Sequence, residues 1–146
     1  MLFRSVEEME NYILSSCISS AIEDTIEKIE KILEQCVRKF YGEYSPAVYD
    51  RTYQLLHSYI KTNVVRNGMG YEARVYFDAS SLDHSASFLT WSEDKILETA
   101  LVGSAPHGGY APAGGTGIWI SAEPILNSSV LNYLKQSLIA NGLPIK

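Results

Sequence analysis

The stretch from Ile22 to Phe40, IEDTIEKIEKILEQCVRKF, indicates the fold more clearly than any other part of the chain. Its apolar residues recur in steps of 4, 3, 4, 3 and 4, which places them on one face of an α-helix. The same spacing extends back towards the N-terminus. The whole apolar face comprises Val6, Met9, Ile13, Cys17, Ile18, Ile22, Ile26, Ile29, Leu33, Cys36, Val37 and Phe40. We therefore expect a long amphipathic helix over residues 1–41 that ends near Gly42, and its apolar seam packs either within the domain or on a neighbouring helix.

Residues 58–78 have the pattern of a β-hairpin. The runs 58–66 and 71–78 are rich in Tyr, Ile, Val and Phe, and they flank the dipeptide Asn67-Gly68. Both residues of that dipeptide tolerate the positive φ that tight hairpin turns require. The sequence thus predicts two strands joined by a turn centred on Asn67 and Gly68.

The second half of the chain alternates helical and glycine-rich segments. Trp91 and Ser92 have the pattern of a hydrophobic staple and N-cap, and they predict a helix that stops at Gly103. Residues 104–117 contain five glycines and two prolines, which predicts a loop that is flexible in the isolated subunit and becomes ordered against a neighbour.

The C-terminal segment predicts one more helix. We interpret Ile118, Trp119 and Ile120 as a short strand or a docking segment. Ser128 is then the expected N-cap of a helix over residues 128–141, before Gly142.

These elements together predict an α+β fold in a single domain over residues 1–146. We expect a long N-terminal amphipathic helix, an antiparallel sheet with a central hairpin, and a C-terminal helix packed on the sheet. A chain of 146 residues can bury one core, whereas two domains of half that length would each be marginal.

Charge and cysteine usage narrow the possible functions. The net charge is −5, and acidic residues gather in the first third of the chain. This argues against a nucleic-acid-binding protein, which would need a basic stripe. The two cysteines, Cys17 and Cys36, fall on the apolar helix face with no Cys-x-x-Cys spacing, which favours a reducing compartment. The first residues include acids where a secretory signal would have a basic and then an apolar region, and no apolar run approaches roughly 20 residues, so we expect neither a signal peptide nor a membrane span. We expect a soluble protein that binds neither nucleic acid specifically nor membranes.

Candidate catalytic groups are scattered along the chain. His57, His84 and His107 lie in separate segments without metal-ligand spacing, and the glycine-rich loop lacks the Lys-Ser/Thr of a phosphate cradle. Asp78 and Asp83 near His84 could be assembled into an acid-base pair, but a serine-rich polar loop explains them equally well. We therefore expect no enzyme activity, no catalytic residues, no cofactor and no metal, and a small hydrolase is the third reading.

The segment 42–58, which joins the helix to the hairpin, is the strongest candidate for a binding surface. Its tyrosines and Arg51 combine large aromatic area with a stacking guanidinium, as binding surfaces often do. Tyrosines and an arginine bonded to helix-end carbonyls would give the same pattern for folding reasons alone. The interface or architectural candidates are Tyr44, Pro46, Tyr49, Arg51, Tyr53, His107, Tyr110 and Trp119.

One known family shares this pattern. The stretch Tyr41, Tyr44, Pro46, Tyr49, Arg51, Thr52, Leu55, Ser58 resembles the motif that follows the first helix in small neck or tail-completion (head-tail joining) proteins of long-tailed bacteriophages and prophages. The order of parts and Gly109-Tyr110 are also similar. Where many of those proteins carry Arg-Pro-Phe before the last helix, this chain has Ile118-Trp119-Ile120.

The resemblance implies a virion structural protein of α+β fold that forms a ring between the capsid portal and the tail tube. Its partners would be copies of itself and other phage neck and tail proteins. Its location would be the host cytoplasm during assembly and then the virion. A different reading is a small acidic regulatory or inhibitory binding protein encoded by a mobile element, which would use the acidic helix to cover a basic surface of a host protein.

The variant Tyr49→Ala separates an architectural role of the tyrosine segment from an interface role. If Tyr49 fixes the angle between helix and sheet, the melting temperature falls strongly. If it lies in an interface, the variant stays a stable monomer that no longer assembles. Thermal melting and light scattering distinguish the two, and wild-type behaviour in both measurements would contradict either role.

Overall fold

The computed structural model describes residues 2–43, 54–68, 70–82, 93–102, 117–143 and 145. The chain's contacts divide it into two compact units. Unit 1 comprises Met1–Glu30, Lys61–Val75 and Asn127–Lys146, and unit 2 comprises Lys31–Ile60 and Tyr76–Leu126. Each unit therefore combines segments that are far apart in the sequence.

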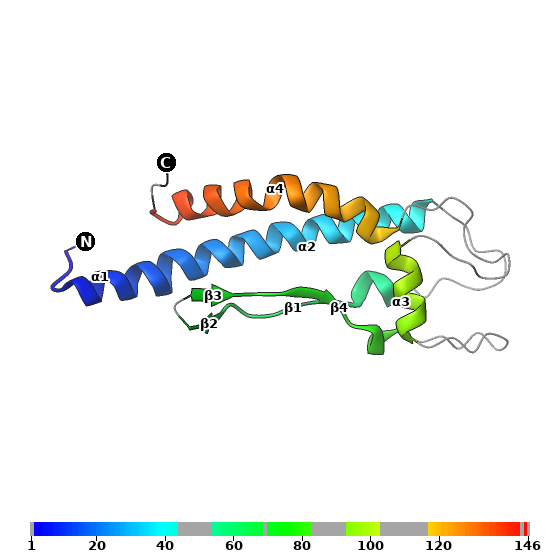
Figure 1. Cartoon of the computed structure of the whole chain (residues 1–146), viewed down its shortest axis with the longest axis horizontal. Coiled ribbons are helices and arrows are strands. Elements are labelled where there is room, and N and C mark those ends of the chain that lie inside the picture. The colour runs from blue at the N-terminus through cyan, green and yellow to red at the C-terminus, as the bar shows by residue number, and fades with distance from the viewer. Residues whose placement is uncertain are drawn as a thin grey trace. The chain divides into compact units, whose positions relative to one another are not determined.

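A single helical run occupies residues 6–42, which confirms the long N-terminal helix. It consists of α1 (Val6–Tyr12), a π-helical stretch η1 (Ile13–Ile18) and α2 (Ser19–Gly42). Figure 1 shows it as one continuous helical ribbon from α1 to α2. Ser5 is the N-cap, and its Oγ accepts a hydrogen bond from the Glu8 N–H at 3.1 Å. The Glu8 carboxylate in turn accepts a hydrogen bond from the Arg4 N–H at 2.6 Å. Each of these two side chains thus satisfies one backbone N–H at the start of the helix.

The π-helical stretch keeps the apolar face of this helix in line. The Ser19 N–H donates to the Leu14 carbonyl, five residues back, so one turn contains an extra residue. In an uninterrupted α-helix, Val6 and Ile22 would lie about 160° apart around the axis, on opposite sides. The extra residue reduces that angle by about 100°, to about 60°. Apolar residues before and after the π stretch therefore share one side.

In unit 1, the C-terminal part of α4 (Ile118–Ala140) packs on α2. Asn141 Nδ2, just past the end of α4, donates to Asp24 Oδ2 at 2.9 Å, and Lys28 Nζ lies 3.5 Å from Ser137 Oγ. Asp24 precedes Lys28 along α2, whereas the partner of Asp24 follows the partner of Lys28 in the sequence. The two helices are therefore antiparallel (Figure 1). We expected this helix to pack on the sheet, but these contacts run to α2.

Gly142 ends α4 as the sequence predicts. Its φ is +92°, the left-handed conformation that glycine adopts without steric cost. The Gly142 N–H donates to the Ile139 carbonyl and the Leu143 N–H to the Leu138 carbonyl, which is the Schellman arrangement. The last carbonyls of the helix thereby find donors.

The hairpin of unit 1 consists of β2 (Val65–Asn67) and β3 (Gly70–Glu72), which pair antiparallel. Asn67 is paired with Gly70, so Asn67 is a strand residue and the turn lies one position later than predicted. Gly68, with φ +61°, is the first central residue of the turn. The expectation of a turn centred on Asn67 and Gly68 is thus corrected by one residue.

Each predicted strand is divided into two short ones. β1 (Tyr59–Lys61) pairs with β4 (Val75–Phe77), separately from the β2–β3 pair. The Thr62 N–H donates to the Arg74 carbonyl at 2.9 Å, while Val65 is the partner of Glu72. Two residues on one side therefore face one on the other, which is the count of a β-bulge. The bulge interrupts the ladder and explains the division.

Unit 2 has its core around the second half of α2. The 3₁₀ turn η2 (Gln54–His57) precedes β1 and buries Leu55. The 3₁₀ turn η3 (Ala79–Ser81) contacts α3 (Glu93–Val102), a helix that ends just before Gly103 as predicted. The buried apolar residues of unit 2 are Ile32, Leu33, Cys36, Val37, Phe40, Leu55, Leu82, Ala100, Ile118 and Ala122.

The start of α4 differs from the sequence prediction. Ile118, Trp119 and Ile120 form its first turn instead of a strand, and Ser128 lies inside the helix instead of capping it. Pro124 lies within α4, where it has no N–H to donate to the Ile120 carbonyl. The helix nevertheless extends through Pro124, because Ile118 and Ala122 are completely buried in unit 2 and their packing outweighs the lost bond.

The variant Gly142→Ala tests the helix end. A methyl group there meets no steric clash, so the cost is that of a left-handed alanine, about 1 kcal/mol. We expect the melting temperature to fall by a few degrees. Gly42→Ala is the matched control, since Gly42 also has open space but no positive φ, and its melting temperature should stay the same or rise. Equal effects of the two substitutions would contradict this account of Gly142.

Candidate interaction surface

Most of the residues singled out from the sequence lie outside the described residues. These are Tyr44, Pro46, Tyr49, Arg51, Tyr53, His107 and Tyr110. The remaining one, Trp119, lies in the first turn of α4 in unit 2, and 47% of it is exposed. An exposed tryptophan is compatible with an interface role, whereas the roles of the other seven stay predictions.

The first turns of the N-terminal helix carry an apolar face that the described residues of unit 1 cover only in part. No residue of α1 is buried, yet Val6 is 66% exposed and Met9 and Tyr12 are each 37% exposed. Phe3 extends this face, because its ring lies 5.4 Å from the ring of Tyr12. We call Phe3, Val6, Met9 and Tyr12 the N-terminal apolar face. An amphipathic helix ordinarily buries such residues, so this face is a candidate for contact with another protein.

The N-terminal apolar face has a strongly acidic border. Residues 1–30 contain seven acidic and two basic side chains. Glu7, Glu8 and Glu10 of α1 are exposed, and among the described residues none of these three has an ion pair. A protein that covers this face must therefore tolerate or neutralise negative charge.

A second uncovered apolar stripe lies on the C-terminal part of α4, also in unit 1. Leu131 is 79% exposed and Ile139 is 49% exposed, and Lys135 lies between them on the same side of the helix. Ser137, which points towards α2, is almost fully buried on the opposite side. We call Leu131, Lys135 and Ile139 the outer α4 face. Residues 127–146 contain two lysines and no acidic residue.

The inner side of the same helix is fixed by polar contacts that sequence reasoning missed. Lys28 of α2 lies beside Ser137 and its Nζ is 5.3 Å from the ring centre of Tyr133, a cation–π distance. Asn141 donates to Asp24 and also to the Ser137 carbonyl at 2.8 Å. Such directional contacts work only when the helices have one particular register. The outer α4 face is thereby held away from α2.

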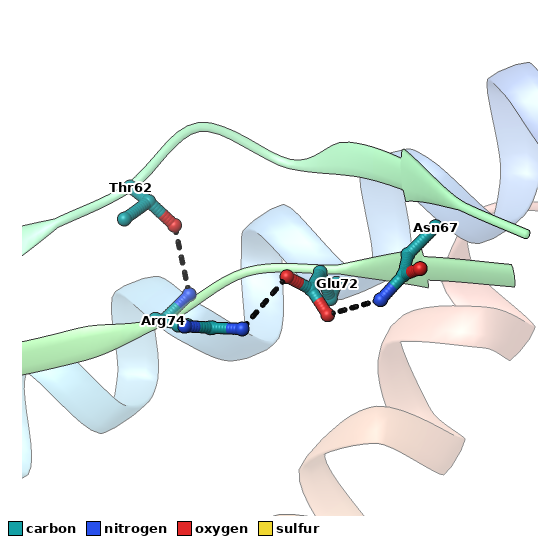
Figure 2. A network of polar contacts seen from close by, with 4 residues as sticks. All are labelled: Thr62, Asn67, Glu72 and Arg74. Atoms are coloured by element: carbon teal, nitrogen blue, oxygen red, sulfur yellow. Dashed lines mark hydrogen bonds and ion pairs between the residues drawn. The ribbon is translucent and has the colours of Figure 1, made fainter.

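A polar network fixes the hairpin (Figure 2). Glu72 Oε2 accepts from Asn67 Nδ2 at 2.6 Å, and Glu72 Oε1 lies 3.1 Å from Arg74 Nη2. At the bulge, Thr62 Oγ1 accepts a hydrogen bond from the Arg74 N–H at 2.9 Å. The hydroxyl thereby satisfies a backbone donor at the point where the strand ladder is interrupted. These groups are largely exposed, so the network sets local geometry more than stability.

Lys61, the last residue of β1, contacts α2 within unit 1. Lys61 Nζ lies 3.4 Å from Glu30 Oε2 and 3.9 Å from Glu27 Oε1. Glu27 and Glu30 are therefore already neutralised in part by Lys61, in contrast to the acidic residues of α1.

Two potentially reactive side chains, Asp78 and Cys36, are among the described residues. Asp78 is the N-cap of η3, and its Oδ1 accepts from the Ser80 N–H and hydroxyl; Asp83 and His84 lie outside the described residues. Burial raises the pKa of the Cys36 thiol, and Lys39 opposes this only in part, so Cys36 stays protonated near neutral pH.

The same part of the chain shows neither of two other kinds of site. Among the described residues, no three His, Cys, Asp or Glu side chains form a group that could hold a metal ion. No helix formed by them has the length and apolar character needed to cross a membrane.

A family model described as YomN matches residues 5–137. The chain belongs to the YomN family. The match begins at Ser5, the N-cap of the first helix, and ends at Ser137, which contacts α2. The YomN region thus includes most of the N-terminal apolar face and the Lys28–Ser137 contact of α2 with α4. No curated protein and no solved structure matches the chain.

A double-mutant cycle on Asp24→Ala and Asn141→Ala tests the register contact between α2 and α4. A hydrogen bond to an exposed carboxylate should give a coupling energy of about 0.5–1 kcal/mol in urea unfolding. The control cycle combines Asp24→Ala with Asn127→Ala, because Asn127 lies about 20 Å further along α4. That pair should be additive, and a coupling for Asn141 no larger than for Asn127 would contradict the contact.

Proposed function

We propose that the chain is a structural virion protein of a phage or prophage, a neck or tail-completion component at the head–tail junction that acts by assembling into an oligomeric ring. The observation that supports this best is the N-terminal apolar face, whose residues are spaced for burial but are only part-covered by the described residues of unit 1. The resemblance of residues 41–58 to the neck-protein motif adds the type of assembly.

The distribution of uncovered surface suits a ring better than an isolated pair. In a cyclic assembly, each subunit offers two different surfaces, one to the preceding copy and one to the next. Unit 1 has two uncovered apolar stripes of unlike charge, the N-terminal apolar face and the outer α4 face. A two-fold dimer would need only one self-complementary patch.

The magnitude of the available burial also favours closed assembly. Complete burial of one apolar side chain contributes about 1.5–3 kcal/mol, and these side chains are already part-covered, so each contributes less. Bringing two subunits together costs roughly 4–15 kcal/mol in lost freedom. A single contact of this size is weak. When a ring closes, the last contact forms within one assembly, so the closed ring is more stable than a set of separate pairs.

In this proposal the protein performs no chemistry and uses no cofactor. Its partners are copies of itself and the neck and tail proteins on either side. The net charge of −5 suits a component close to a channel for DNA, because like charge lets the polymer slide where a basic wall would bind it.

The acidic border of α1 favours a second candidate function. Three glutamates that have no ion pair among the described residues lie beside an apolar stripe, and they are also suited to covering a basic surface of a host protein. In that case the protein is a small acidic regulator or inhibitor carried by a mobile element. The two candidates differ in whether the partner belongs to the virion.

The test is to measure where the protein is found and in what state. We expect mass spectrometry of purified particles to detect it, and light scattering to show a discrete oligomer alone or with the tail-tube subunit. A monomer that is absent from particles and binds a basic host protein would contradict the virion role and support the regulator.

A further inference from the structure

We propose that neighbouring copies dock head to tail through unit 1, with the N-terminal apolar face of one copy packed on the outer α4 face of the next. This inference rests on the proposed ring assembly and names the two surfaces that form it. The occupant of each surface is a second copy of this chain.

The first argument is that the N-terminal apolar face continues an interior surface. The π-helical stretch aligns Val6 and Met9 with the side of the helix on which Cys17 and Ala21 are buried. That side is covered along α2 and becomes uncovered along α1, where no residue is buried. A helix from another copy that covered the N-terminal apolar face would therefore continue the apolar packing found along α2.

The second argument is charge complementarity. Residues 1–30 carry seven acidic and two basic side chains, whereas residues 127–146 carry two lysines and no acid. Pairing of α1 with α1 would oppose Glu7, Glu8 and Glu10 to their own copies, and pairing of two outer α4 faces would oppose Lys135 to itself. Docking of α1 on the outer α4 face instead brings Lys135 to unpaired glutamates.

The third argument is similarity of shape along the two helices. Leu131, Lys135 and Ile139 follow each other at four-residue steps, so they form a narrow stripe. Val6 and Met9 form a similarly narrow stripe, with Glu10 at its edge. Two stripes of this kind can pack side by side with the lysine at the border, where water and salt still reach it.

The test uses Val6→Asp, which disables the N-terminal apolar face, and Leu131→Asp, which disables the outer α4 face. Both side chains are mostly exposed, so both variants should melt like wild type. The matched control is Val65→Asp on the hairpin of the same unit, where Val65 is 51% exposed. Sedimentation at matched concentrations gives the oligomeric state of each.

We expect wild type and Val65→Asp to assemble alike, and each of the other two variants to assemble at least tenfold more weakly. An equimolar mixture of Val6→Asp and Leu131→Asp should form heterodimers, because each retains the surface that the other lacks. The charge reversals Glu10→Lys and Lys135→Glu should each weaken assembly, and the double variant should recover part of it.

Three outcomes would overturn this docking. One is a wild-type oligomer that persists unchanged in both aspartate variants, which leaves the proposed ring intact but moves its contacts elsewhere. Another is a mixture of the two variants that stays monomeric although each is folded. The third is wild type that is monomeric alone but present in purified particles, which removes self-docking and keeps the virion role.

Discussion

The alignment of the apolar face along residues 6–42 is the constraint on which the rest of the structure depends. Its spacing changes by one position between Cys17 and Ile18, and an uninterrupted α-helix would turn the two parts of the face to opposite sides. The π-helical stretch absorbs this change. The part after it is covered in each unit, whereas no residue of α1, in the part before it, is buried.

The sequence predicted the elements whose signals are local. The helical run has a long and regular apolar period, Gly142 is the residue that a left-handed helix end requires, and the hairpin follows from two β-rich runs around a glycine turn. The π-helical stretch also had a signal, since the adjacent apolar residues Cys17 and Ile18 mark a shift of one position in the period. It was overlooked because each residue fits the helical pattern when taken alone.

The errors have two physical causes, which are long-range packing for the last helix and a contact across the hairpin for its turn. Ser128 predicted a late start for the last helix, but burial of Ile118 and Ala122 extends it by ten residues. The hairpin turn was placed one residue early because Asn67 also has a role in the strand, where its side chain binds Glu72. For the candidate site, the sequence singled out the tyrosine segment, whereas the uncovered faces on α1 and α4 emerge only when burial is known. The periodicity of apolar residues in a sequence does not by itself tell which of them are buried in the folded protein.

The bulge beside the Thr62–Arg74 pair has a consequence for the proposed assembly of many copies. Each of the two-stranded ladders has open edges, and open edges invite strands of other molecules to pair with them. The bulge breaks the regular row of donors and acceptors, and the exposed cations Lys61, Arg66 and Arg74 are costly to bury beside a foreign strand. Copies at high local concentration can then associate through their helices without fusing into the continuous sheets of an amyloid-like aggregate.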